Sequence, residues 1–335
     1  MIFHYRAIIL VAVLCATASR GLAAECQGHD LFPVLKSEAP AAYAAIEAAA
    51  SAMPFRHGKL FRLSRTGTGS SYVFATLHLS DRRITGFSPR LRAAVADSKI
   101  VALESVETGA VLRQALINGR AAWRHAIIAR ENQRADSLLG KTDFAQLEAL
   151  AARKALPKSA AHEFKPSVLA LILDLPACAV RVPGATPYVD ELVADIARER
   201  KIPTVGLETT IEQVEVLNGL PRETERDLLV AILRQADRAE DVIETMVARY
   251  EEGDIGGLLA WLRSADPIPG VARAQIPPPF LDRLITSRNQ RMRDRALPLL
   301  RRGAAFIAVG AAHLPGKEGL LSLFEKEGYE VETVE

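Results

Sequence analysis

The chain has 335 residues, of which 49% are hydrophobic and 24% charged, so it can bury a large core and lacks the polar bias of a disordered protein. Its 42 basic and 40 acidic residues give a formal net charge of +2. This balance provides no strongly basic surface, which argues against nucleic acid or an anionic membrane as the main partner.

The N-terminus has the pattern of a signal peptide. Arg6 precedes the apolar run 7–18, and Gly21 and Ala23 are small residues at the spacing of a signal-peptidase site. The run is too short to span the roughly 30 Å of membrane hydrocarbon as a helix. We predict that residues 1–23 are removed, leaving a periplasmic or secreted chain, 24–335, without a stable membrane anchor. The alternative is a buried N-terminal helix.

The number and positions of the cysteines are consistent with an exported protein. Cys15 leaves with the signal peptide, and Cys26 and Cys178 remain. In an oxidising compartment two such residues form a disulfide that ties the N-terminal segment to the rest of the chain. We predict this bridge, the alternative being two unpaired buried thiols.

The mature chain begins with an Ala-rich helical segment, 30–53, interrupted at Pro40. Strands at 60–65 and 70–76 follow, joined by a glycine-bearing hairpin connection, Thr66-Gly67-Thr68-Gly69. A short helix at 89–97 then leads to a third strand at 99–103.

The remainder is mainly helical. Apolar residues recur at helical spacing in 106–134, 143–155, 166–173, 188–200, most of 212–263, 281–301 and 319–327. Short strands are predicted at 202–206, 304–309 and 329–334. Strands that alternate with helices predict an α/β fold. We expect one domain, 24–335, with a mixed β-sheet, helices on both faces and large helical insertions at about 106–200 and 212–301.

Four of the predicted strands end at an ionisable residue. These are His78 after YVFAT, Glu104 after KIVAL, Glu208 after IPTVGL and His313 after FIAVG. In α/β sheets, ligands usually bind beyond the carboxyl ends of the strands. The sequence therefore predicts that these four side chains converge.

Imidazole nitrogen and carboxylate oxygen together suit zinc, manganese, cobalt or iron. A divalent ion with an open coordination position can activate water as a nucleophile. The alternative is a separate local role for each residue, such as a favourable contact of Glu104 with a helix dipole. Glu208 lacks an obvious local role, because Thr209 and Glu212 already form the capping box of the next helix.

Other sequence features indicate no competing chemistry. The remaining histidines of the mature chain have no ligand-spaced partner and are interpreted as surface or structural residues: His29, His57, His125 and His162. Walker loops, Gly-x-Ser-x-Gly elbows and Cys-x-x-Cys motifs are all missing from the sequence. Nucleotide-binding, serine-hydrolase and thioredoxin interpretations are thereby weakened.

Several motifs together resemble the TraB/GumN family, which includes the animal Tiki metalloproteases and is similar in fold to erythromycin-esterase and ChaN-like proteins. The motifs are Ala75-Thr76-Leu77-His78, Glu104, Gly206-Leu207-Glu208-Thr209 with Gln213, and Gly310-Ala311-Ala312-His313-Leu314-Pro315-Gly316. The resemblance extends from about Phe55 to the C-terminus. It implies a metal-dependent hydrolase, although the GumN name reflects polysaccharide gene clusters rather than chemistry.

One position departs from the family pattern, because Ala75 stands where the first motif usually has glycine. If this position needs a positive φ, the added methyl group costs roughly 1 kcal/mol or more; in an ordinary strand conformation alanine is harmless.

Arg288-Asn289 and Asp190 also resemble the family. Arg288 could pair with a carboxylate or hold a substrate carbonyl, or belong to a solvated basic face with Arg291 and Arg295. Asp190 is expected to cap or decorate its helix.

The leading hypothesis is an exported metal-dependent hydrolase, a peptidase, that acts on a peptide or small-molecule substrate. His78 and His313 would be metal ligands, Glu104 and Glu208 would serve as ligand or general base, and Arg288 would stabilise an oxyanion. One alternative is a protein that binds a metal or haem without turnover. Another is an accessory protein in envelope polysaccharide biosynthesis. Metal content and chelator-sensitive turnover separate these hypotheses.

Overall fold

The computed structural model describes residues 26–79, 81–106, 125–154, 156–179, 187–264, 268–269 and 282–335. The predicted signal peptide and most of the helix predicted at 106–134 lie outside these ranges. Within them, no helix combines the length and the apolar character needed to cross a bilayer.

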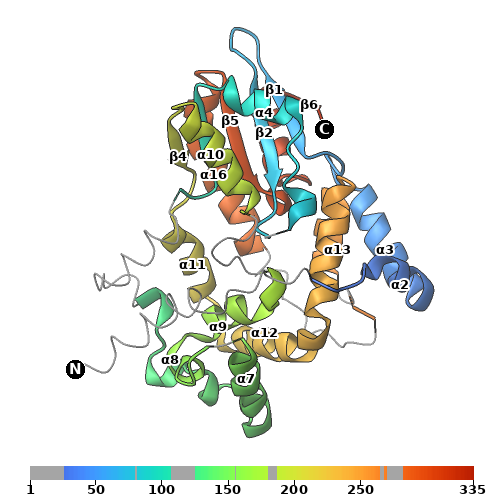
Figure 1. Cartoon of the computed structure of the whole chain (residues 1–335), viewed down its shortest axis with the longest axis vertical. Helices are drawn as coiled ribbons and strands as arrows, with labels where there is room; N and C mark the ends of the chain where they lie inside the picture. The colour runs from blue at the N-terminus through green and yellow to red at the C-terminus, as the bar shows by residue number, and fades with distance from the viewer. Residues whose placement is uncertain are drawn as a thin grey trace.

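A six-stranded mixed sheet forms the upper part of the molecule in Figure 1, with the strand order β4-β3-β5-β2-β1-β6. β4, β3, β5 and β2 are parallel, whereas β1 is antiparallel to both β2 and β6. The strands are β1 (Leu60–Ser64), β2 (Ser71–Thr76), β3 (Ile100–Leu103), β4 (Thr204–Gly206), β5 (Ala305–Gly310) and β6 (Glu330–Thr333). The predicted α/β class and all six predicted strands are confirmed.

Helices cover the centre of this sheet. Because β5 is apolar and buried at each of residues 305–309, both of its faces must be covered. α10 (Val189–Glu199) packs on β3, β5 and α4 (Pro89–Ala96), while α16 (Thr286–Leu300) packs on β5 and α17 (Leu320–Lys326). Burial of these apolar side chains is the main stabilising contribution, at about 25 cal/mol per Å² of apolar surface.

Helices away from the sheet build two further cores. In the lower part of Figure 1, α7 and α9 pack with α12 around Leu147, Leu169 and Leu229. A third core surrounds Trp261, where α2 and α3 meet α14. Their helices are α2 (Leu31–Glu38), α3 (Pro40–Ser51), α7 (Lys141–Arg153), α8 (Ala160–Glu163), α9 (Pro166–Asp174), α11 (Thr210–Asn218), α12 (Arg222–Gln235), α13 (Ala239–Glu251) and α14 (Ile255–Arg263).

Short 3-10 helices connect these elements: η1 (Arg82–Ile84), η2 (Glu131–Gln133), η3 (Ala135–Ser137), η4 (Ala177–Ala179), η5 (Ala236–Arg238) and η6 (Ala311–His313). One of them, η2, corrects the sequence analysis, because the predicted helix does not continue to residue 134. Ile128 instead forms an antiparallel bridge with Phe164. Ser137 then donates its hydroxyl to Arg134 O, the kind of side-chain bond that competes with an α-helix.

The predicted disulfide is present. It joins Cys26, at the start of the described chain, to Cys178 in η4, and the two Cα atoms are 5.2 Å apart. The bridge links segments 152 residues apart in the sequence.

Candidate functional site

Three of the predicted site residues leave the same edge of the sheet. In the parallel pairing of β2 and β5, Thr76 lies opposite Gly310, so His78 and His313 follow neighbouring strand ends. β3 lies on the other side of β5 and ends at Leu103, directly before Glu104. The parallel arrangement therefore brings the two imidazoles and this carboxylate to one end of the sheet.

Gly310 marks the point where these side chains meet. A Cβ atom at Gly310 would lie 3.2 Å from Glu104 Oε2, 3.5 Å from His313 Cδ2 and 3.9 Å from His78 Nε2. Its backbone N–H donates to Glu104 Oε2 at 2.9 Å. The glycine thus keeps open a small space bordered by both histidines and the carboxylate.

His313 is buried and is held through one ring nitrogen. Its Nδ1 lies 2.6 Å from Asn289 Oδ1, and Asn289 Nδ2 donates to Glu318 O at 2.8 Å. Since that second bond orients the amide, Nδ1 is the protonated nitrogen and Nε2 keeps its lone pair. Burial, aided by the charges of Arg288 and His78, lowers the pKa of His313 to about 4. The ring is therefore neutral at pH 7.

His78 is held in a similar way by an acidic residue. Its Nδ1 lies 2.8 Å from Asp190 Oδ2, its Nε2 lies 3.7 Å from Glu104 Oε2, and about half of its side chain, 53%, is exposed. Desolvation disfavours the charged ring, but Asp190 and Glu104 outweigh it and raise the pKa of His78 well above its usual value. Asp190, in the first turn of α10, thus contacts a site histidine rather than merely decorating its helix.

Glu104 is buried and both of its oxygens are engaged. Oε1 accepts from Gln213 Nε2 at 2.9 Å and also from Arg288, whereas Oε2 accepts from the Gly310 N–H and faces His78. Burial opposes ionisation of this carboxyl group, but its contact with His78 and its electrostatic interactions with the nearby His313 and Arg288 hold its pKa well below its usual value.

Arg288 connects Glu104 to Glu208. Its Nε donates to Glu208 Oε2 at 2.8 Å, and its terminal nitrogen bonds to Glu104. The other oxygen of Glu208, Oε1, accepts from Arg291 at 3.0 Å. Arg288 is therefore not part of a solvated basic face, and both oxygens of the buried Glu208 contact guanidinium groups.

The loop that presents Glu208 is fixed by local interactions. Thr209 N donates to Glu212 Oε2 at 2.8 Å, and Thr209 Oγ1 accepts from Glu212 N at 3.3 Å. This predicted capping box is confirmed and leaves Glu208 available for the arginines. Glu208 N also donates to Glu104 O at 2.8 Å, which brings the two backbones together.

Sequence reasoning assigned no role at the site to three contributors. Asn289 orients His313, Arg291 binds Glu208, and Tyr250 donates its hydroxyl to Ala75 O at 2.8 Å. The position of Asn289 beside Arg288 was the only available signal. Ala75 is not among the described non-glycine residues with a positive φ, so alanine is unstrained at this departure from the family pattern.

The donor chemistry of this edge fits a divalent metal, but its present geometry is not a coordination site. Across the described ranges, no three His, Cys, Asp or Glu side chains are grouped to hold a metal ion. His78 Nε2, Glu104 Oε2 and the ring of His313 nevertheless border one space, and both histidines have Nδ1 engaged as metal-ligating histidines usually do.

Comparison with known proteins finds two curated relatives. Metalloprotease TIKI2 of Xenopus tropicalis is 26% identical over 186 residues, covering 49% of this chain and 35% of that protein. Metalloprotease TIKI1 of Homo sapiens is 29% identical over 167 residues, covering 44% of this chain and 33% of that protein. The chain thus spans about a third of the length of these curated relatives.

No solved structure matches the chain. The TraB/PrgY/gumN family matches residues 60–333, which include every strand of the described sheet and all five predicted site residues. The chain belongs to the TraB/PrgY/gumN family.

Proposed function

We propose that the protein is a metal-dependent hydrolase that cleaves peptide bonds, with His78, His313 and Glu104 as ligands of a divalent ion. The single observation that carries this proposal is the meeting of His78 Nε2, the His313 ring and Glu104 Oε2 around Gly310. Two imidazoles and a carboxylate form a donor set suited to zinc, manganese, iron or cobalt.

The same observation separates the roles of the two glutamates. Glu104 presents Oε2 to the space beside the histidines, whereas Glu208 has both oxygens on arginines. We therefore assign Glu104 to the metal and assign Glu208 to the positioning of Arg288. This assignment narrows the sequence hypothesis, in which either glutamate could be the ligand or the general base.

When bound, a divalent ion would supply a Lewis acid that polarises a carbonyl and acidifies water. Around it, Asn289 holds His313 in the tautomer with a free Nε2, and Asp190 holds the Nδ1 side of His78. Arg288 offers a fixed guanidinium group at the edge of the site, where negative charge on a substrate oxygen would be stabilised.

The peptide-bond part of the proposal is supported by the two relatives named metalloproteases. An exported location is supported by the signal-peptide pattern at 1–23 and by the Cys26–Cys178 disulfide, since such bridges persist in oxidising compartments.

The test is cleavage of a peptide library by the purified mature chain, with and without a chelator. We expect chelator-sensitive cleavage that is lost in His313→Ala and retained in His29→Ala, since His29 is an exposed histidine elsewhere on the molecule. The Glu208→Gln variant should reduce kcat more than it changes metal content, because Glu208 acts through Arg288.

Cleavage that resists the chelator, or that survives in His313→Ala, would contradict metal-dependent hydrolysis. Metal binding without any cleavage would favour the alternative of a binding protein.

A further inference from the structure

A second polar site lies in the helical insertions, away from the strand ends. It is a cavity of about 410 Å³ lined by Asn132, Gln133, Lys165, Leu220, Arg222 and Glu225. This volume is within the range of small-molecule binding sites. α11 separates the two places: Gln213 near its start contacts Glu104, and Leu220 follows its end.

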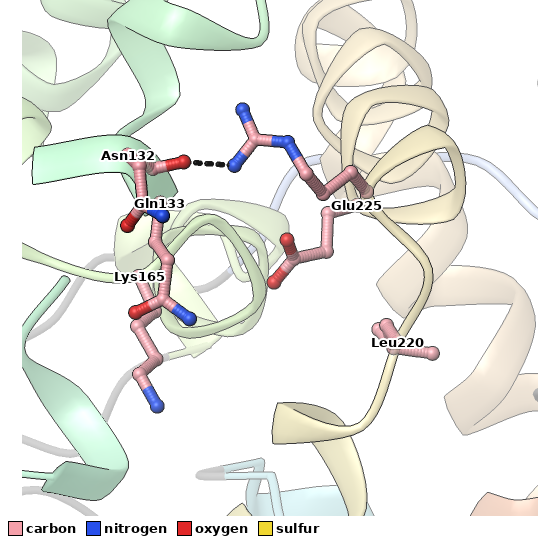
Figure 2. A pocket seen from close by; sticks show the side chains of 6 residues that line it. Asn132, Gln133, Lys165, Leu220 and Glu225 are labelled. Atoms are coloured by element: carbon pink, nitrogen blue, oxygen red, sulfur yellow. Dashed lines mark hydrogen bonds between the residues drawn. The ribbon is translucent and has the colours of Figure 1, made fainter. Parts of the chain in front are cut away.

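Two helix starts contribute to the cavity walls. Lys165 is the N-cap residue of α9, and Arg222 and Glu225 lie in the first turn of α12. Figure 2 shows Asn132, Gln133 and Lys165 on one side of the cavity, with Glu225 and Leu220 on the facing side. The positive ends of both helix dipoles therefore add to the charges of the basic side chains.

Two of the charged residues of the cavity, Lys165 and Glu225, are partly withdrawn from water, whereas Arg222 is exposed. Lys165 is only 6% exposed, a rare degree of burial for lysine. Burial lowers the pKa of Lys165, an effect that Glu225 opposes and Arg130 reinforces. Burial likewise raises the pKa of Glu225, which the charges of Arg222 and Lys165 oppose. Charged groups in such surroundings bind complementary ligand charges more strongly than exposed groups do.

Positive charges outnumber negative charges on the walls of the cavity, and one of the positive groups is held in place. Arg222 donates to Asn132 O and, at 3.1 Å, to Ser137 Oγ, so its guanidinium group is fixed. Among the lining residues, the two cations Lys165 and Arg222 outnumber the single carboxylate of Glu225. A ligand that complements this arrangement carries more negative than positive charge, but it needs one cationic group.

We propose that this cavity binds a small acidic amino acid, with its carboxylates against Lys165 and Arg222 and its ammonium group against Glu225. The side-chain amides of Asn132 and Gln133 provide further hydrogen-bonding groups. The site is independent of the proposed hydrolase function, because it shares no residue with the strand-end site.

Isothermal titration calorimetry on the mature chain tests this with three matched probes. These are glutamate, glutarate, which lacks the ammonium group, and 4-aminobutyrate, which lacks one carboxylate. We expect glutamate to bind best. Lys165→Met should weaken glutamate binding by about tenfold or more, the scale of one lost charge-assisted hydrogen bond. Lys158→Met, at an exposed lysine of the same insertion, should leave it unchanged.

Glu225→Gln is a second variant, for which the two probes should respond in opposite directions. It should weaken the binding of glutamate and strengthen the binding of glutarate. This reversal keeps the test decisive if Lys165→Met fails to fold. Binding should persist in His313→Ala, which separates the cavity from the strand-end site. The proposal is overturned if no binding of glutamate is detected at about 10 mM, a concentration well above the dissociation constant expected of a specific site, about 1 mM or lower. It is equally overturned if glutamate and glutarate bind alike or if the Lys165→Met variant binds as the wild type does.

Discussion

Asn289 is the residue on which the state of His313 depends. Its Oδ1 accepts from His313 Nδ1 at 2.6 Å, and its Nδ2 is held by Glu318 O. Asn289→Leu removes this acceptor at similar size and leaves a buried N–H without its partner. We expect metal affinity to fall by about 10- to 100-fold and the free energy of unfolding by about 1–3 kcal/mol, measured by metal titration and urea unfolding.

Asn289→Asp is the matched control, because it retains an acceptor for His313 Nδ1 while losing the donor to Glu318 O. Nitrogen-15 NMR of the imidazole should show an Nδ1–H tautomer in the wild type and in Asn289→Asp, but a mixture in Asn289→Leu. The same tautomer and metal affinity in all three proteins would show that Asn289 does not orient the ring.

At the scale of single elements, β2 shows why alanine is accepted in the first histidine motif. Ala75 is fully buried, its carbonyl accepts from Tyr250, and it is not among the described residues with a positive φ. Ala75→Gly should therefore destabilise the protein by about 0.5–1 kcal/mol through added backbone freedom, without tightening metal binding. A thermal melt and a metal titration on the same variant check this. Tighter metal binding would mean that the alanine methyl group strains the site.

α11 and α16 are joined by an ion pair beside the site. Glu212 Oε1 and Oε2 each accept from Arg295 at 2.8 Å. These bonds, together with those from Thr209, lower the pKa of Glu212 to about 2. Since its folded pKa lies below the usual value of 4.5, the pair stabilises the fold above about pH 4.5. This contribution is lost as the pH falls toward 2.

Glu212→Gln should cost about 1 kcal/mol at pH 7, the combined scale of a cap and a surface ion pair. The difference from the wild type should shrink by pH 3, as measured by urea unfolding at both pH values. Glu325→Gln, at an exposed glutamate on α17, serves as the control. A Glu212→Gln deficit that is equal at both pH values would rule out the ion pair as its source.

Helices and strands could be predicted where the pattern that specifies them lies in neighbouring residues of the sequence. The apolar run 305–309 became β5, and the Thr209–Glu212 capping box formed as expected. The tertiary contacts of single polar side chains were not predictable in this way. Arg288, Arg291 and Arg295 look alike in the sequence, yet only Arg288 reaches both Glu104 and Glu208. Similarly, the bridge from Ile128 to Phe164 depends on a partner distant in sequence.

At the scale of the whole molecule, the Cys26–Cys178 disulfide closes a loop with a sequence separation of 152 residues. In the chain-entropy account, such a loop stabilises the fold by up to about 5 kcal/mol. The Cys26→Ser, Cys178→Ser double variant should unfold at lower urea concentration than the oxidised wild type. Mass spectrometry of the unreduced protein provides the direct check, and two free thiols would contradict the bridge.

The central claim is that strand ends distant in sequence form one metal site around Gly310. Elemental analysis of the mature protein, gently purified without chelators, tests it most directly when wild type, His78→Ala, His313→Ala and His29→Ala are compared. The account predicts one divalent ion per chain in wild type and His29→Ala, and loss of that ion in the other two variants, all with native circular dichroism. A wild type without stoichiometric metal, or metal retained in both His78→Ala and His313→Ala, would contradict it.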